Sequence, residues 1–433
     1  MKMKRKRIGR PGRTLIFGFL AIIFAGGLLL SCPFTHNKPA GISLPDALFV
    51  ATSAVCVTGL TPVDIAATFN VAGRTIIAVL IQLGGLGFAS IAIFFLTIFG
   101  KTIGAGQRSL LKEALNSESN RGLVGIVQVL MAGSAIVELV GAASLYRIFS
   151  RTYRPAEAIG MSLFHSISAF NNAGFDLLGN FSSLTGYQDD AGMNITISLL
   201  IILGGLGFFV YQDILLMIRR KKRLSTHSKI VLSMSGILIA VGMLLFMATD
   251  GLSPMEAWFQ SITARTAGFN TVDMASLSTA GLLVMTMLMF IGASPASTGG
   301  GIKTTTLMTL FVMVLSLPAH RQPTAFRRKI STESILKALV VVTMAASAVL
   351  LGTFALAMLE GDRFPLSHLL FESVSAFATV GLTCDVTPHL GTLSKLILMA
   401  LMFLGRLGPL TIASSFRFKE QNLSYVEEKI LIG

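Results

Sequence analysis

Four short segments of the sequence centre on a glycine and could carry chemistry through the backbone. They are Val57, Thr58 and Gly59; Asn172, Ala173 and Gly174; Thr266, Ala267 and Gly268; and Thr379, Val380 and Gly381. The residues before the glycine differ among the four, so a shared function cannot depend on their side chains. Glycine permits backbone dihedral angles with which successive carbonyl groups turn the same way. Four such segments around one axis would form a ring of carbonyl oxygens, which can replace the hydration shell of a cation.

The same short helix is predicted before each glycine. An aromatic residue lies ten positions upstream in every case, and helix-start signals precede it. The aromatic residues are Phe49, Phe164, Trp258 and Phe371, and the signals are "SLPD" at 43–46, "RPAE" at 154–157, "SPME" at 253–256 and "PLS" at 365–367. A helix of about ten residues is about 15 Å long, roughly half the thickness of membrane hydrocarbon. It must therefore be a re-entrant pore helix, and its partially negative C-terminal end would favour a cation.

The composition places these helices in an integral membrane protein. Of the 433 residues, 53% are hydrophobic and only 13% are charged, and the mean hydropathy is +0.73. Soluble domains carry about 25% charged residues. Eight apolar runs are long enough to cross a membrane. They lie at about 14–31, 71–99, 123–149, 192–218, 227–248, 279–317, 335–359 and 393–418.

These runs and short helices predict an all-α polytopic fold made of four repeats around one pore. Each repeat would contain a full crossing, a pore helix with its loop, and a second full crossing, in a pseudo-fourfold arrangement. The predicted segments are a basic N-terminus at 1–13, repeats at 14–101, 122–223, 227–317 and 335–418, and a tail at 419–433.

Basic residues indicate the orientation of the chain. They gather at the ends of apolar runs, in "MKMKRKRIGRPGR" at the start, in 219–223 and in 327–329. This positive-inside pattern predicts a plasma-membrane protein with both termini in the cytoplasm, and it explains the net charge of +14 without nucleic-acid binding. The start of the chain, which runs into "LLLSC" at Cys32, also resembles a lipoprotein signal peptide. Cleavage there would remove the first helix of a repeat, which the other three repeats keep.

The predicted second crossings share a glycine pattern. It occurs as "LGGLGF" at 83–88 and 203–208, "IGAS" at 291–294 and "LGRLG" at 404–408. Small residues at Gly84, Gly204, Gly292 and Gly405 favour close helix contact over a hinge.

The third repeat departs from the pattern. A straight helix over 279–317 would be about 58 Å long, so it must break, and "GASPASTGGGIKTTT" is the expected site because Pro295 and three glycines disfavour helix. We interpret Gly299, Gly300, Gly301 and Lys303 as a gate beneath the carbonyl ring, with a structural kink as the alternative. The run does not satisfy a phosphate-binding loop, since Ile302 separates the last glycine from the lysine.

An arginine departs from the pattern in the fourth repeat. Arg406 takes the position that Gly85 and Gly205 occupy in earlier repeats. An arginine at membrane depth costs about 2.5 to 3.5 kcal/mol, so it should face a water-filled cavity or a partner. If Arg406 faces the cavity, it would belong to the gate, and its positive charge would slow the passage of a cation. The alternative is a salt bridge between Arg406 and Glu138. Arg265 is expected to brace the third segment.

On these residues the chain resembles the Trk/Ktr/HKT superfamily of potassium transporters, and specifically its Ktr-type membrane subunit. The resemblance covers the four repeats, the four glycines, "GGGIKTTT", the Arg406 position and the short tail that ends at Gly433. Thr379, Val380 and Gly381 also match the first letters of potassium channel filters.

The resemblance implies potassium uptake through a filter of backbone carbonyls, in a potassium-channel-like fold. It further implies a homodimer with one pore per subunit, bound to a cytosolic ring of nucleotide-binding regulatory subunits of the RCK type. Potassium would be the substrate, with sodium as an activator or co-ion, and the chain would bind no cofactor. The alternative is a sodium-selective or weakly selective member, although glycine at all four positions resembles the potassium-selective ones.

An enzyme is not expected. The sequence has no Ser/His/Asp set, no HExxH motif and no paired intramembrane aspartates. Its three cysteines lack the spacing of a transition-metal site.

Overall fold

The computed structural model describes residues 11–37, 41–99, 101, 103–114, 123–221 and 223–415. Most of the predicted basic N-terminus and the whole predicted tail at 419–433 lie outside the described residues. The described chain is almost entirely helical, and its one strand pair is a short hairpin. The all-α fold class is confirmed.

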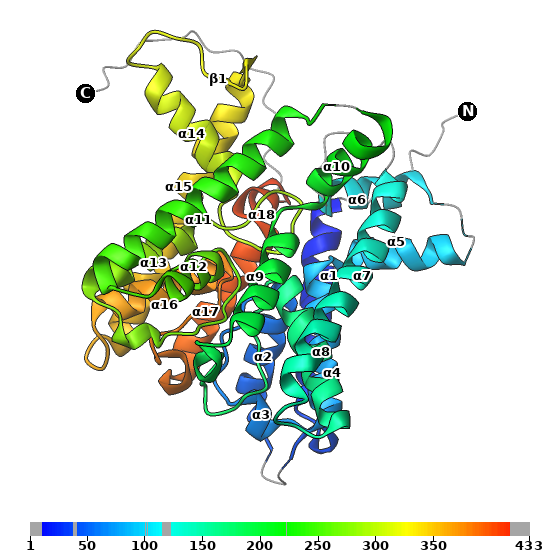
Figure 1. Cartoon of the computed structure of the whole chain (residues 1–433), viewed down its shortest axis with the longest axis vertical. Helices are drawn as coiled ribbons and strands as arrows, with labels where there is room; N and C mark the ends of the chain where they lie inside the picture. The colour runs from blue at the N-terminus through cyan, green and yellow to red at the C-terminus, as the bar shows by residue number, and fades with distance from the viewer. Residues whose placement is uncertain are drawn as a thin grey trace, which may run out of the picture.

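Each of the four repeats contains a long helix, a pore helix and a second helix (Figure 1). The long helices are α1 (Pro11–Leu30), α7 (Leu123–Phe149), α11 (Thr226–Asp250) and α15 (Thr332–Glu360). The pore helices are α2 (Leu44–Cys56), α8 (Pro155–Phe170), α12 (Pro254–Thr263) and α16 (Leu366–Ala378). The second helices are α4 (Val71–Gly85), α9 (Ala191–Gly205), α13 (Thr279–Phe290) and α17 (Thr392–Leu407).

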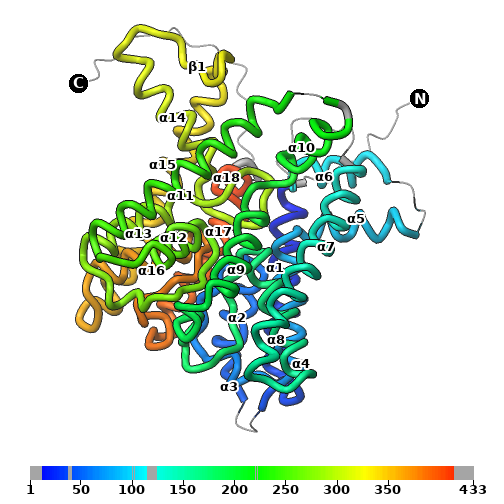
Figure 2. The backbone as a smooth tube through the Cα atoms, viewed as in Figure 1, coloured from blue at the N-terminus to red at the C-terminus, as the bar shows by residue number. Residues whose placement is uncertain are grey.

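Shorter elements connect and extend these helices. They are α3 (Ile65–Thr68), α5 (Phe88–Ile98), α6 (Ala105–Ala114), α10 (Phe208–Arg220), α14 (Thr304–Ser316), α18 (Pro409–Ser415), the 3-10 turns η1 (Pro33–Thr35), η2 (Thr185–Tyr187), η3 (Met274–Ser276) and η4 (Thr387–His389), and the strands β1 (Thr324–Ala325) and β2 (Arg328–Lys329). Helix α5 projects sideways from the helix bundle, and α14 leads away from it toward β1 (Figure 2).

The four repeats close into a ring. The second helix of each repeat packs against the pore helix of the next one, which gives the pairs α4 with α8, α9 with α12, α13 with α16 and α17 with α2. Because the last pair joins the fourth repeat to the first, the arrangement is cyclic and all four pore helices take equivalent places.

The pore helices begin at the predicted signals. Ser43 caps α2 by accepting the N–H of Asp46, and Ser253 and Glu256 form a full capping box on α12. Three pore helices are longer than the predicted ten residues, with 13 residues in α2, 16 in α8 and 13 in α16. Even α8, at about 24 Å, falls short of the roughly 30 Å of hydrocarbon.

The second helices of the first two repeats are bent, which the sequence did not predict. In the described chain four helices are long and apolar enough to cross a membrane, and the count reaches six if each bent pair is one span. The pairs α4 with α5 and α9 with α10 are each bent by 92°. The bends lie at Gly87 and Gly207, whose positive φ values of 78° and 88° end the α-helical path. Gly408, with φ of 82°, separates α17 from α18 in the same way.

The predicted break in the third repeat is confirmed. Helix α13 ends at Phe290 and α14 begins at Thr304. Between them the chain forms a loop whose neck is closed by a bridge between Ile291 and Ile302. We refer to residues 292–303 as the intramembrane loop.

The glycines of the second helices allow close contact, as predicted. A methyl group on Gly84, Gly204 or Gly405 would overlap a backbone carbonyl at the end of the adjoining pore helix, namely that of Val55, Phe170 or Phe377. Each of these carbonyls lies four residues before a segment glycine. Gly292 instead meets the backbone of Gly300 within the intramembrane loop.

This contact predicts that two glycine-to-alanine substitutions change the melting temperature in different ways. Gly204→Ala should lower the melting temperature of the detergent-purified protein by several degrees, because overpacking costs about 1 to 3 kcal/mol. Gly236→Ala on α11 should leave it unchanged or raise it, because a methyl group there meets nothing within 4 Å. Equal melting temperatures for both variants would contradict the close packing.

Candidate functional site

The four glycine segments share one backbone conformation. The segment glycines have φ values of 99°, 67°, 83° and 97° for Gly59, Gly174, Gly268 and Gly381. The residues two positions earlier also have positive φ, at 58° for Val57, 58° for Asn172, 72° for Thr266 and 54° for Thr379. Non-glycine residues rarely adopt this region, so its recurrence four times at one position marks an imposed backbone path.

Hydrogen bonds to a serine near the end of the pore helix hold this path in three repeats. In the first, the N–H of Thr58 donates to the carbonyl of Ser53 at 2.8 Å, and the N–H of Gly59 donates to the Ser53 hydroxyl at 3.0 Å. In the fourth, Val380 and Gly381 bond in the same way to Ser375. In the second, the N–H of Ala173 donates to the carbonyl of Ser168 at 2.8 Å.

These serines were missed by sequence reasoning. Each lies six residues before its segment glycine, a spacing visible in the sequence. The third repeat has Ile262 at this position; there the N–H of Ala267 donates to the carbonyl of Thr263 at 3.0 Å, and the Thr263 hydroxyl donates to the carbonyl of Phe269.

The four glycines abut one another in a ring. A methyl group on Gly59 would lie 2.6 Å from the carbonyl oxygen of Ala173, and one on Gly174 would lie 2.8 Å from that of Ala267. Methyl groups on Gly268 and Gly381 would overlap the carbonyl oxygens of Val380 and Thr58. Each glycine therefore faces the carbonyl of the next repeat, and the space that a side chain would fill is taken by backbone oxygen.

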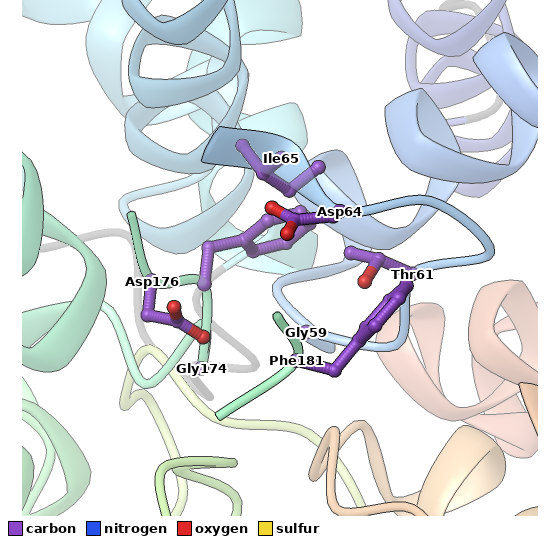
Figure 3. Close-up of a pocket in the computed structure, with 8 residues that line it drawn as sticks. Gly59, Thr61, Asp64, Ile65, Gly174, Asp176 and Phe181 are labelled. Atoms are coloured by element: carbon purple, nitrogen blue, oxygen red, sulfur yellow. The ribbon is translucent and has the colours of Figure 1, made fainter. Parts of the chain in front are cut away.

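On one side of the ring, a small pocket of about 30 Å³ lies between the first and second segments (Figure 3). Asp64 and Asp176 line it, next to Gly59 and Gly174. Asp64 accepts the N–H of Asn180 at 2.6 Å. Burial raises the pKa of Asp176 to about 6; the backbone N–H of Leu178 opposes this, and the nearby carboxylate of Asp64 adds to it. Acidic side chains therefore lie on this side of the ring.

On the other side, the intramembrane loop lies directly against the ring. The N–H of Gly300 donates to the Thr379 hydroxyl at 3.1 Å, and a methyl group on Gly299 would overlap the Thr266 hydroxyl. The Thr298 hydroxyl donates to the carbonyl of Phe170 at 3.2 Å. The loop therefore contacts three repeats at the base of the ring, and the segment threonines, which we had expected to matter only through their backbone, carry the contact.

Lysine and the bent second helix hold the loop in shape. The Nζ of Lys303 donates to the carbonyls of Gly299 at 2.7 Å and Gly300 at 3.3 Å. The N–H of Ser294 donates to the carbonyl of Gly205 at 3.1 Å, and the N–H of Phe208 donates to that of Ala296 at 2.9 Å. The bend after α9 thus frees backbone groups that the loop uses.

Arg406 fastens the loop to the first repeat. Its guanidinium donates to the carbonyl of Thr298 in the loop and to those of Gly84 and, at 3.1 Å, Gly85. A cavity of about 250 Å³ borders the loop, and both Lys303 and Arg406 line it. We gave two interpretations of Arg406, a cavity-facing side chain and a salt bridge. In the structure Arg406 faces a cavity.

The alternative salt bridge between Arg406 and Glu138 is wrong. Glu138 accepts hydrogen bonds from Gln82, at 3.0 Å to each carboxylate oxygen, and from Asn171 at 3.1 Å. Arg265 donates to the Ser235 hydroxyl at 3.0 Å, which anchors the third segment to α11.

Comparisons with known proteins agree with this architecture. The sequence profile of the TrkH family, described as cation transport protein, matches residues 20–249 and 237–425. The chain belongs to the TrkH family. It is 40% identical to the Ktr system potassium uptake protein B of Bacillus subtilis, over 98% of this chain and 97% of that protein. It is 38% identical to the potassium/sodium uptake protein NtpJ of Enterococcus hirae, over 100% and 99%.

A solved structure of this family has the same fold. The crystal structure of the potassium transporter TrkH from Vibrio parahaemolyticus aligns with a TM-score of 0.73 at 17% identity, over 96% of this chain and 87% of that one. The four-repeat architecture of this TrkH-family chain is thereby established.

Two further buried side chains brace the segments in this TrkH-family chain. Glu372 and His165 both lie nine residues before a segment glycine. Glu372 accepts from the hydroxyls of Thr383 and, at 2.9 Å, Thr387. His165 accepts the N–H of Leu177 at 3.4 Å. Each ties the pore helix to the chain that leaves the ring.

Loss of the Glu372 acceptors should destabilise the protein. Glu372→Gln replaces one carboxylate oxygen, an acceptor, with an amide NH₂ group, a donor, at a buried site where the neighbouring groups are donors. A buried hydrogen bond that is not made costs about 1 to 3 kcal/mol. The melting temperature should therefore fall by about 5 °C or more. The matched control Glu333→Gln removes an exposed pair with Lys337 and should change it little. Equal, small changes in both would show that Glu372 braces nothing.

Proposed function

We propose that this chain takes up potassium ions across the plasma membrane through the ring of segment carbonyls. The observation that carries the proposal is the closed ring of four glycines, each facing a carbonyl oxygen of the next repeat. No side chain fits inside such a ring. Backbone oxygens are therefore the ligands available to an ion there, and carbonyl rings suit a weakly hydrated cation.

Charge supports a cation. The C-terminal ends of α2, α8, α12 and α16 lead into the four segments, and helix C-termini carry partial negative charge. Asp64 and Asp176 beside the ring would add to the attraction. The names of two relatives, one a potassium uptake protein and the other a potassium/sodium uptake protein, agree with this class of substrate. A sodium-selective or weakly selective transporter is the alternative.

We also propose that the intramembrane loop is the gate. Gly299 and Gly300 lie against the threonine hydroxyls at the base of the ring, where an ion would leave it. Lys303 and Arg406 add positive charge beside this path, which would oppose a partly dehydrated cation. Opening would require two changes. The loop would move away from the Thr379 hydroxyl, and Arg406 would release the loop carbonyl of Thr298.

Regulation and assembly are proposals that rest on the resemblance to Ktr-type proteins. A homodimer on a cytosolic ring of nucleotide-binding subunits would act on the gate from the cytoplasmic side, where the basic segments and both termini are expected. Sodium would act as an activator or co-ion. The chain itself would be a transporter, not an enzyme, and would bind no cofactor.

Uptake measurements test the ion and the ring together. Expression of this chain in a bacterial strain that lacks its own potassium uptake systems should restore growth at low potassium. Growth is compared with and without sodium, and with and without a regulatory partner. Gly268→Ser should weaken potassium selectivity, because a methylene group would enter the space held by the Val380 carbonyl. Tight selection of sodium over potassium by the unchanged protein would overturn the proposal.

The gate predicts faster flux when the loop is released. In proteoliposomes that contain this chain alone, Arg406→Gln and deletion of residues 296–301 should each raise potassium flux several-fold, because each removes contacts that hold the loop at the ring. Arg363→Gln is the control, since Arg363 donates to the carbonyl of His389 at 3.0 Å, away from the loop. Unchanged flux in both test variants would contradict a gate.

A further inference from the structure

An apolar cavity of about 490 Å³ lies between α7 and α10, apart from the ring and the loop. Ile126, Leu130 and Gly133 of α7 line one wall, and Tyr211 and Leu215 of α10 line another. This volume is within the range of small-molecule sites. An apolar space does not hold water well, so hydrocarbon is the occupant that suits it within a membrane.

The lining is shaped for a hydrocarbon chain. Gly125 and Gly133 leave the α7 wall open, since a methyl group on either meets nothing within 4 Å. The polar tip of Tyr211 is already engaged, because its hydroxyl donates to the carbonyl of Leu203. The cavity therefore presents mostly methyl, methylene and ring surfaces, with few polar groups left to orient a polar ligand.

Positive charge continues from the cavity along α10. Tyr211, Leu215 and Arg219 follow one another at four-residue spacing, so they share one face of the helix. Arg219 is exposed, as are Lys221 and Arg223 just beyond it. The acid of this helix, Asp213, already accepts hydrogen bonds from Ser225 and Ser228. The basic side chains are thus available for an anion at the end of the cavity.

We propose that this cavity binds an acyl chain of an anionic phospholipid, whose phosphate lies near Arg219. The positive-inside pattern assigns the lipid to the cytoplasmic leaflet, and basic clusters on that side favour anionic headgroups. Lipid tails are as apolar as the lining, so van der Waals packing in the cavity, together with the basic side chains, would hold the seated chain.

The position of the cavity links the lipid to the transport machinery. Phe170 and Phe208 both line it. Phe170 ends the second pore helix, and its carbonyl accepts from Thr298 of the intramembrane loop. Phe208 begins α10 just after the bend, and its N–H donates to Ala296 of the same loop. A chain in the cavity would therefore support the bent form of α9 and α10 that holds the loop.

Lipid binding can be measured without transport. Detergent-purified protein is titrated with phosphatidylglycerol or phosphatidylcholine and analysed by native mass spectrometry and thermal melting. Phosphatidylglycerol should bind and raise the melting temperature, with phosphatidylcholine at least several-fold weaker. Gly133→Leu, which fills the cavity, should weaken phosphatidylglycerol binding at least tenfold, whereas Gly236→Leu, an open glycine on α11, should not.

Further variants keep the test decisive. If Gly133→Leu does not fold, Gly125→Leu fills the same cavity from a position about two turns away on α7. Arg219→Gln should reduce the preference for phosphatidylglycerol over phosphatidylcholine and leave chain binding intact. Unchanged phosphatidylglycerol binding in the folded cavity-filling variant would overturn the site. Equal binding of both lipids by the unchanged protein would overturn the assignment of an anionic lipid. If the cavity-filling variant instead binds lipid normally but changes its oligomeric mass, the cavity face would be a contact with a second copy of the chain.

Discussion

The approach of four backbone loops to one axis is the constraint on which the rest of this structure depends. At the ring each repeat has room for a carbonyl group and none for a side chain, so glycine is required at Gly59, Gly174, Gly268 and Gly381. The left-handed residue two positions earlier and the pore helix before it then follow, because they set the direction in which each loop arrives. Gly84, Gly204 and Gly405 let the second helices approach the ends of those pore helices.

The ring is nearly symmetric, but the side that the intramembrane loop occupies is not. In the third repeat the second helix is interrupted by the intramembrane loop, and hydrogen bonds from the other repeats stabilise this loop. Bends in α4 and α9 free the carbonyls of Gly84, Gly85, Gly204 and Gly205, and these accept from Arg406 or from amides of the loop. The bends and the loop are therefore parts of one hydrogen-bonded assembly, since backbone groups at membrane depth need partners.

Membership of the TrkH family and the residues of this assembly support one account. In the proposed function the backbone would supply a uniform cation site, and residues that differ among the repeats, such as Thr379, Lys303 and Arg406, would control it from the side where the loop lies. Glu372 and His165 add braces that the other repeats do not have at the same position. Symmetry would thus serve selectivity, and departures from symmetry would serve regulation.

The sequence by itself determined the features that depend on local spacing. The four repeats, the pore-helix starts at Ser43 and Ser253 and the break before Thr304 could be predicted, because glycine, proline and capping residues act within a few positions. Tertiary structure decided which distant groups meet. Arg406 bonds to Thr298 and Gly84 and not to Glu138 because the ring brings the first, third and fourth repeats together. The 92° bends lie at Gly87 and Gly207, but the groups that bond to the freed backbone come from other repeats, which no local pattern records.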